Sequence, residues 1–107
     1  MSTGVFFQAL ADDTRRQVIE LLSEGPHRAG RLAQSTGTTP AAMSRHLRVL
    51  LESGLVSDER LAGDARVRVF RLRPEPLHDL RAWLDQVQAH WTEQLQSFAA
   101  HAEKGTR

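Results

Sequence analysis

The stretch from Thr39 to Leu50, TPAAMSRHLRVL, decides the fold of this chain. Thr39 is a good helix N-cap because its hydroxyl can accept a hydrogen bond from a free amide of the first turn, and Pro40 suits the first helical position, where no N–H is needed. The sequence therefore predicts that a helix begins here. At about 100° per residue, its side chains divide into two faces.

The two faces of this helix differ in chemistry. Met43, Leu47 and Leu50 fall together, which predicts a side buried in a core. The other side offers two guanidinium groups, a hydroxyl and a small residue, the combination that a recognition helix presents to the major groove of DNA. A solvated basic face on an ordinary amphipathic helix is the alternative. The residues on or beside this polar face are Ala41, Ser44, Arg45 and Arg48.

A second short helix is predicted just before the central one. The segment RAGRLAQS, residues 28–35, has helical spacing of small and apolar residues, and a Gly-containing turn follows it. Gly54 ends the central helix, because glycine accepts the left-handed cap conformation. Residues 28–54 therefore predict a helix-turn-helix. At the amino end of its second helix, contacts to DNA are expected from Thr38 and Thr39.

Residues 55–73 predict a β-hairpin. Two runs rich in Val, Leu, Phe and Arg are separated by AGDA, residues 62–65, which is a turn signal at hairpin distance. A two-stranded hairpin directly after a recognition helix is a wing. Arg66 and Arg68 lie near its tip, where they would reach phosphates or the adjacent minor groove; a solvated arginine hairpin is the alternative.

Apolar residues mark both ends of the chain. Residues 4–11 form an apolar segment too short for a stable isolated helix, and residues 74–104 predict a helix over 40 Å long, longer than so small a body can cover. The distal half of this helix needs a partner, for which we expect a second copy of the chain. The predicted dimer-interface residues are Phe6, Phe7, Leu10, Leu84, Val87, Trp91, Leu95 and Phe98.

Charge is segregated along the chain. Residues 28–73 hold nine arginines against four carboxylates, a net charge of +5, whereas residues 1–27 and 74–107 each carry −2. A positive field confined to the middle is the electrostatic footprint of a nucleic-acid-binding domain. The chain has no cysteine, which excludes disulfides and thiolate chemistry, and no long apolar run, so we expect a cytoplasmic protein without a membrane span.

The order helix, helix, helix-turn-helix, wing and long helix predicts one domain over residues 1–107, mainly α with a two-stranded β-hairpin. This winged helix-turn-helix resembles the ArsR-type repressors. Three segments resemble that family: FQALADDTRRQVIELL at residues 7–22, SRHLRVLLESGLV at residues 44–56 and RVFRL at residues 68–72. The resemblance covers nearly the whole chain.

The resemblance implies a homodimeric repressor that binds double-stranded DNA at a palindromic operator near its own promoter, with the first and last helices as the dimer interface. Ser44, Arg45 and His46 match the family's DNA-contacting positions. Pro40 stands where the family often has a glutamine for adenine, so base specificity must come from other side chains. For His46 two roles stay open, a phosphate contact or a structural hydrogen bond.

The metal motifs that many ArsR-type proteins carry are missing here. His90 and His101 lie about 16 Å apart along one helix, but in an antiparallel dimer His90 of one copy could approach His101 of the other and, with a carboxylate, bind zinc; this alternative stays open. Exposed histidines on a polar face are the commoner case, so we predict no metal site and no cofactor. A small-molecule effector stays open. Catalysis is not expected, because His78 and Asp79, adjacent on a helix, point apart. The alternative function, a winged-helix module for protein–protein interaction, does not explain the +5 middle.

Overall fold

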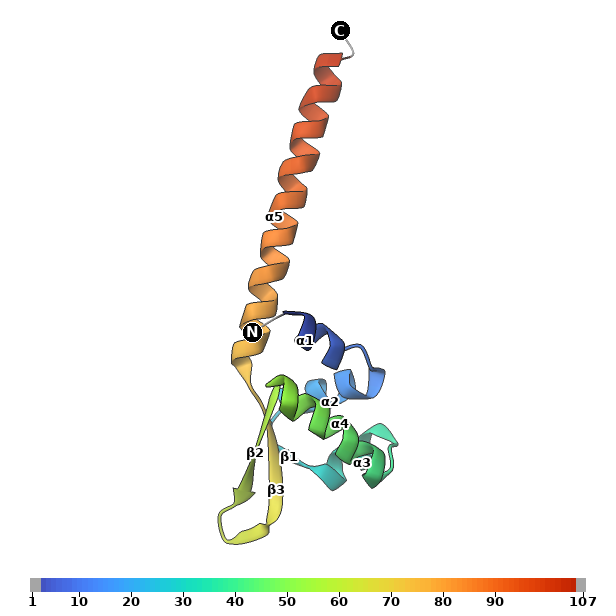
Figure 1. Cartoon of the computed structure of the whole chain (residues 1–107), viewed down its shortest axis with the longest axis vertical. Helices are drawn as coiled ribbons and strands as arrows, with labels where there is room; N and C mark the ends of the chain where they lie inside the picture. Colours follow the sequence, from blue (N-terminus) through green and yellow to red (C-terminus); the bar gives the residue numbers. More distant parts are fainter. Residues whose placement is uncertain (1–2, 106–107) are drawn as a thin grey trace.

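The computed structural model describes residues 3–105. Four short helices and a small sheet form a body from which one long helix projects (Figure 1). The elements, in chain order, are α1 (Thr3–Ala9), α2 (Asp13–Ser23), β1 (His27–Arg28), α3 (Ala29–Thr36), α4 (Pro40–Ser53), β2 (Val56–Leu61), β3 (Asp64–Leu72) and α5 (Pro74–Gly105).

Helix α4 begins and ends where the sequence predicts. The Thr39 hydroxyl accepts a hydrogen bond from the Ala42 amide at 3.2 Å, and Pro40 occupies the first turn. Gly54 closes the helix in the left-handed conformation, with φ of 83°. The apolar face is confirmed as well, because Met43, Leu47 and Leu50 are all buried.

The predicted two-stranded hairpin is confirmed as β2 and β3, and a third, short strand that was not predicted extends the sheet. Its order is β1-β3-β2, all antiparallel, and the added strand β1 pairs His27 with Phe70 and Arg28 with Val69. Two residues are too few to show an alternating pattern, and their partner lies some 40 positions later, so local sequence could not reveal this strand. In space, β1 joins the start of α3 to the base of the wing.

The wing itself is the hairpin of β2 and β3. Pairing runs from Val56 opposite Leu72 to Leu61 opposite Asp64, with a register shift after Arg60. The turn is tighter than the four residues predicted, and it depends on Gly63, whose φ of 101° suits glycine. The hairpin extends from the body at the end opposite α5 (Figure 1).

One core cluster fills the space between the helices and the sheet, and it includes part of the segment expected at the dimer interface. Phe6 is fully buried by its own chain and Leu10 is half-buried against the same cluster. The structure therefore removes Phe6 from the predicted dimer interface, whereas for the half-buried Leu10 an interface contact stays a prediction. A seven-residue helix cannot hold itself together, so α1 is fixed by inserting Phe6 into the core.

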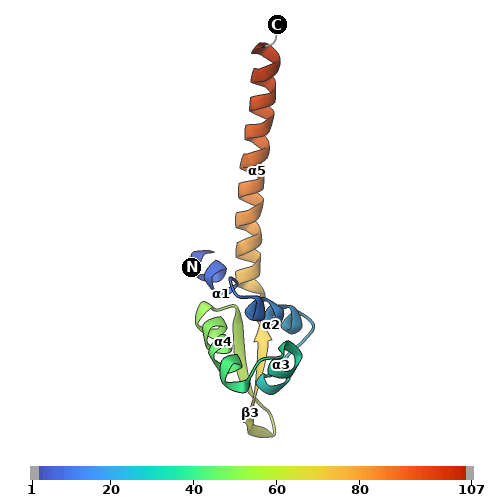
Figure 2. The same cartoon turned by 90° about the vertical axis from the view of Figure 1, so that its right-hand side faces the viewer.

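Helix α5 lies against the body only at its start. Leu80 is buried, Phe7 of α1 packs edge-on against Trp83 with ring centroids 5.2 Å apart, and every side chain from Arg81 to Glu103 is classed as exposed. The molecule is consequently 74 Å long but only 26 by 22 Å across (Figure 2). Among residues 3–105, no helix has the length and apolarity needed to cross a membrane.

We predict that Leu50→Ala lowers the free energy of unfolding by about 2–5 kcal/mol, because it leaves a cavity where a fully buried side chain touched the core. Urea denaturation at a fixed protein concentration measures this loss. The control, Leu61→Ala, removes a side chain that is 40% exposed near the hairpin turn, and it should cost much less. Equal losses for both variants would contradict this account of the core.

Candidate nucleic-acid interface

The polar face of α4 is free to meet a partner. Ser44, Arg45 and Arg48 are exposed, on the side of α4 away from its buried face. Within the part of the chain that the structure describes, neither Arg45 nor Arg48 has an ion-pair partner. The donors of the two guanidinium groups are therefore available to an external ligand, and no ion-paired carboxylate of the described chain offsets their positive field.

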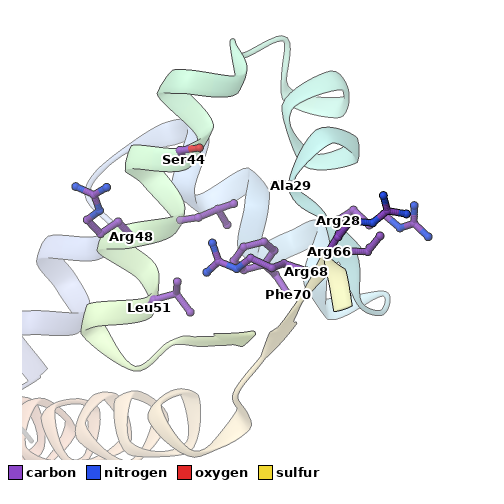
Figure 3. Close-up of a pocket in the computed structure, with 10 residues that line it drawn as sticks. Arg28, Ala29, Ser44, Arg48, Leu51, Arg66, Arg68 and Phe70 are labelled. Carbon is purple, nitrogen blue, oxygen red and sulfur yellow. The ribbon is translucent and has the colours of Figure 1, made fainter. Parts of the chain in front are cut away.

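A hollow of about 540 Å³ separates this face from the wing. Ser44, Arg48 and Leu51 line it from α4, while Arg68 and Phe70 line it from β3 (Figure 3). The figure shows Arg68 extended from the wing toward α4. A cleft with cations on both walls suits the phosphate backbone of a nucleic acid better than it suits a neutral ligand.

The two wing arginines named from the sequence lie in different environments. Arg68 donates two hydrogen bonds to the Asp58 carboxylate, at 2.9 and 2.7 Å, and its guanidinium lies 5.0 Å from the centre of the Phe70 ring. These contacts hold Arg68 in one orientation. Arg66 is 91% exposed and pairs only with Asp64, two residues away on the same strand.

Arg28 belongs to the same surface, and sequence reasoning did not single it out. It lines the hollow from the junction of β1 and α3, and Figure 3 shows it beside Arg66. A hydrogen bond from the Arg66 side chain holds the pKa of the Asp64 carboxyl below its usual range, and the charge of Arg28 adds to that effect. Only the pairing of β1 with β3 brings Arg28 next to the wing, so no local signal could have indicated it.

The smaller predicted DNA contacts surround the amino end of α4. Thr39 and Ala41 are exposed, and the Thr39 hydroxyl already caps the helix. Thr38 is half-buried, and its hydroxyl accepts a hydrogen bond from the Thr36 hydroxyl at 2.9 Å. In the first turn of α4, Pro40 has no N–H and the amides of Ala42 and Met43 donate to Thr39, which leaves the Ala41 amide for an anion; Thr38 contributes to the shape of the turn.

His46 lies away from the hollow. Its side chain is 20% exposed and its Nδ1 is 3.3 Å from Nη1 of Arg15 on α2 and 3.9 Å from Oδ1 of Asp12. Of the two roles considered for His46, this geometry favours the structural hydrogen bond. Residues 3–105 contain no group of three or more His, Cys, Asp or Glu side chains suited to a metal ion.

Known proteins are similar to this chain in sequence. The family model described as "Bacterial regulatory protein, arsR family" matches residues 12–58. The HTH-type transcriptional regulator Rv2034 of Mycobacterium tuberculosis is 43% identical over 93 residues, 87% of this chain and 81% of that protein. The transcriptional repressor SdpR of Bacillus subtilis is 35% identical over 54 residues, 50% of this chain and 60% of that protein.

Solved structures agree with the fold. One neighbour is the solution structure of the homodimeric winged helix-turn-helix DNA-binding domain Mb0332 from Mycobacterium bovis, a possible ArsR-family regulator. It is similar to this chain with a TM-score of 0.63 and 26% identity, over 85% of this chain and 82% of that one. The predicted winged helix-turn-helix architecture is thereby confirmed.

We predict that Asp12→Ala destabilises the protein at neutral pH by about 1 kcal/mol, because the Asp12 carboxylate caps α2 by accepting from the Arg15 amide at 3.0 Å. That same hydrogen bond holds the pKa of Asp12 below its ordinary value of 3.8; partial burial opposes the shift, and electrostatic interactions with His46 and with Arg15 add to it. A lowered pKa stabilises the fold above pH 3.8, and this contribution is lost as the pH falls further.

Thermal unfolding at pH 7 and pH 3 tests this prediction. The difference in Tm between wild type and Asp12→Ala should be largest at pH 7 and should shrink at pH 3. Glu20→Ala, which removes an exposed carboxylate of the same helix, is the control and should change Tm little at either pH. A difference for Asp12→Ala that grows toward pH 3 would contradict the assignment.

Proposed function

The chain belongs to the arsR family of bacterial regulatory proteins and is a DNA-binding transcriptional repressor with a winged helix-turn-helix, and we propose that it acts as a homodimer on an inverted-repeat operator near its own promoter. In this proposal, α4 enters the major groove and the wing lies along the neighbouring backbone. The protein works in the cytoplasm, without a catalytic role or a resident metal.

One observation carries the proposal: α4 buries one face completely and presents two unpaired arginines and a serine on the other. Arg45 and Arg48 carry the planar fork of donors that matches guanine edges, and Ser44 can contact either kind of base pair. The exposed Ala41 lets the helix approach the bases closely. Base reading is therefore assigned to α4.

Phosphate contacts are assigned to the rim of the hollow. Arg28, Arg66 and Arg68 come from two elements that the sheet holds together, so they form a single surface. Asp58 keeps Arg68 extended toward α4, which supports one phosphate contact at a defined position. Arg66, almost fully exposed, is free to follow the backbone or enter the minor groove.

The long helix supplies the dimer contact. Its apolar side chains repeat at intervals of 3, 4, 4 and 3 residues, close to one helical period, so they form one stripe about 21 Å long. Nothing in the described chain covers this stripe, and a second copy is the partner that the homodimeric Mb0332 domain suggests. The exposed residues of the stripe are Leu84 (53%), Val87 (47%), Trp91 (61%), Leu95 (49%) and Phe98 (72%).

We predict that Arg45→Ala weakens operator binding by about 10- to 100-fold, because it removes donors to a base edge. Fluorescence anisotropy with a duplex identified by footprinting the DNA beside the coding sequence measures the change. Arg71→Ala is the matched control, because Arg71 pairs with Glu59 and does not line the hollow. If wild type ignored every such duplex at low salt, the interaction-module alternative would replace this proposal.

We also predict that Trp91→Glu converts the dimer into monomers and weakens operator binding by at least tenfold, since a charge would enter the centre of the stripe and the two half-sites would be bound separately. Sedimentation at micromolar concentration gives the mass. Ala89→Glu places the same charge on the opposite side of α5 and should leave mass and affinity unchanged. A dimeric Trp91→Glu protein would remove this stripe from the interface.

A further inference from the structure

Two neighbouring arginines of α2 hold the carboxyl end of α1. Arg15 donates from Nε to the Ala9 carbonyl at 2.5 Å and from Nη2 to the Gln8 carbonyl at 3.3 Å. Arg16 donates from Nη1 to the Leu10 carbonyl at 2.6 Å and pairs with Asp13. Carbonyl groups at a helix end lack partners within the helix, so these cations complete α1 and fix its direction.

Arg15 also reaches the recognition helix, which Arg16 does not. Its Nη1 lies 3.3 Å from Nδ1 of His46 on α4. A guanidinium has donors only, so in this hydrogen bond Arg15 donates and Nδ1 of His46 accepts. His46 lies roughly 160° around α4 from Arg48, so the contact is on the side of α4 away from the arginine-lined hollow.

The contact joins two parts of the molecule with different assigned roles. Helix α1 packs on α5 through Phe7 and Trp83, and α5 carries the stripe assigned to the dimer. Helix α4 carries Arg45 and Arg48. Arg15 is bonded to α1 on one side and to α4 on the other, and the Asp12 carboxylate accepts the Arg15 amide, which holds this residue in place.

We propose that Arg15 and His46 are positioning residues for operator recognition: their hydrogen bond sets the orientation of α4 relative to α1, and through α1 relative to the dimer helix α5. This inference rests on the proposed function. His46, in this assignment, contacts no DNA. It acts through the side chains of Arg45 and Arg48, whose distance to base edges depends on how α4 is tilted.

The expected consequence of breaking this contact is a selective loss of affinity for the operator. Base contacts need donors placed to within a fraction of an ångström, whereas phosphate attraction depends on charge and tolerates a small tilt. Loosening α4 should therefore weaken binding to the operator and leave binding to unrelated DNA nearly unchanged. Because no phosphate contact is lost, the dependence of affinity on salt should keep its slope.

The test compares His46→Leu with His46→Asn. Leucine removes the acceptor, while the Asn side-chain oxygen can occupy the place of Nδ1 and accept from Arg15. We expect His46→Leu to lose about tenfold in operator affinity with an unchanged salt slope and an unchanged affinity for poly(dI-dC), as coupling across one partly buried contact predicts. His46→Asn should recover most of that loss. Anisotropy titrations at several salt concentrations provide all three quantities.

Variants of Arg15 complete a double-mutant cycle with the His46 variants. Arg15→Met should reduce operator affinity as His46→Leu does, and the double variant should lose no more than the worse single variant. Arg16→Met is the matched control, because Arg16 also caps α1 but does not touch α4, and it should bind the operator like wild type. Sedimentation checks that each variant is still dimeric. A loss of operator affinity in a dimeric variant cannot then be attributed to dissociation of the dimer.

Three results would overturn the inference. A salt slope reduced by about one in both His46 variants would make His46 a phosphate contact. Equal losses for operator and unrelated DNA would show a general loss of folded protein. Wild-type affinity in His46→Leu would show that the contact has no role in recognition. Failure of the wild-type protein to bind any duplex would instead count against the proposed function.

Discussion

The structure depends on the burial of one face of α4. Met43, Leu47 and Leu50 leave water together, and each is worth about 1.5–3 kcal/mol of favourable transfer free energy when fully buried. Because these three side chains occupy a single side of the helix, their burial also determines where the opposite side points. The exposure of Arg45 and Arg48 is thus a consequence of core packing. No additional contacts are needed to orient these two side chains toward solvent.

Charge on the recognition surface is arranged in two ways. The arginines of α4 are unpaired, so they can adapt to bases, whereas Arg68 on the wing is held by the Asp58 carboxylate and the Phe70 ring. A held side chain loses little conformational entropy on binding, but the negative charge of the paired carboxylate partly offsets its attraction for phosphate. In the proposed complex with DNA, the held Arg68 would set the register on the backbone and the free arginines of α4 would read the sequence, the division expected of a protein that binds specific DNA.

Most of the fold could be predicted because its determinants are local. The predicted caps at Thr39 and Gly54 depend on neighbouring amides and on backbone conformation, and both are present in the structure. Three features could not be predicted in this way. Strand β1 has two residues, Arg28 meets the wing only through that strand, and Phe6 enters the core although its neighbour Phe7 does not. Each depends on contacts between distant segments.

By itself, the sequence determined the helix boundaries, the two-faced character of α4 and the apolar stripe of α5. It also determined the concentration of positive charge between residues 28 and 73. Residue spacing and composition control all of these properties within a few turns of chain. The tertiary structure alone decided that Arg28 joins the wing, that Asp58 holds Arg68, and that His46 meets Arg15 rather than the DNA side. Those outcomes depend on the angles at which helices and sheet pack, which local spacing does not encode.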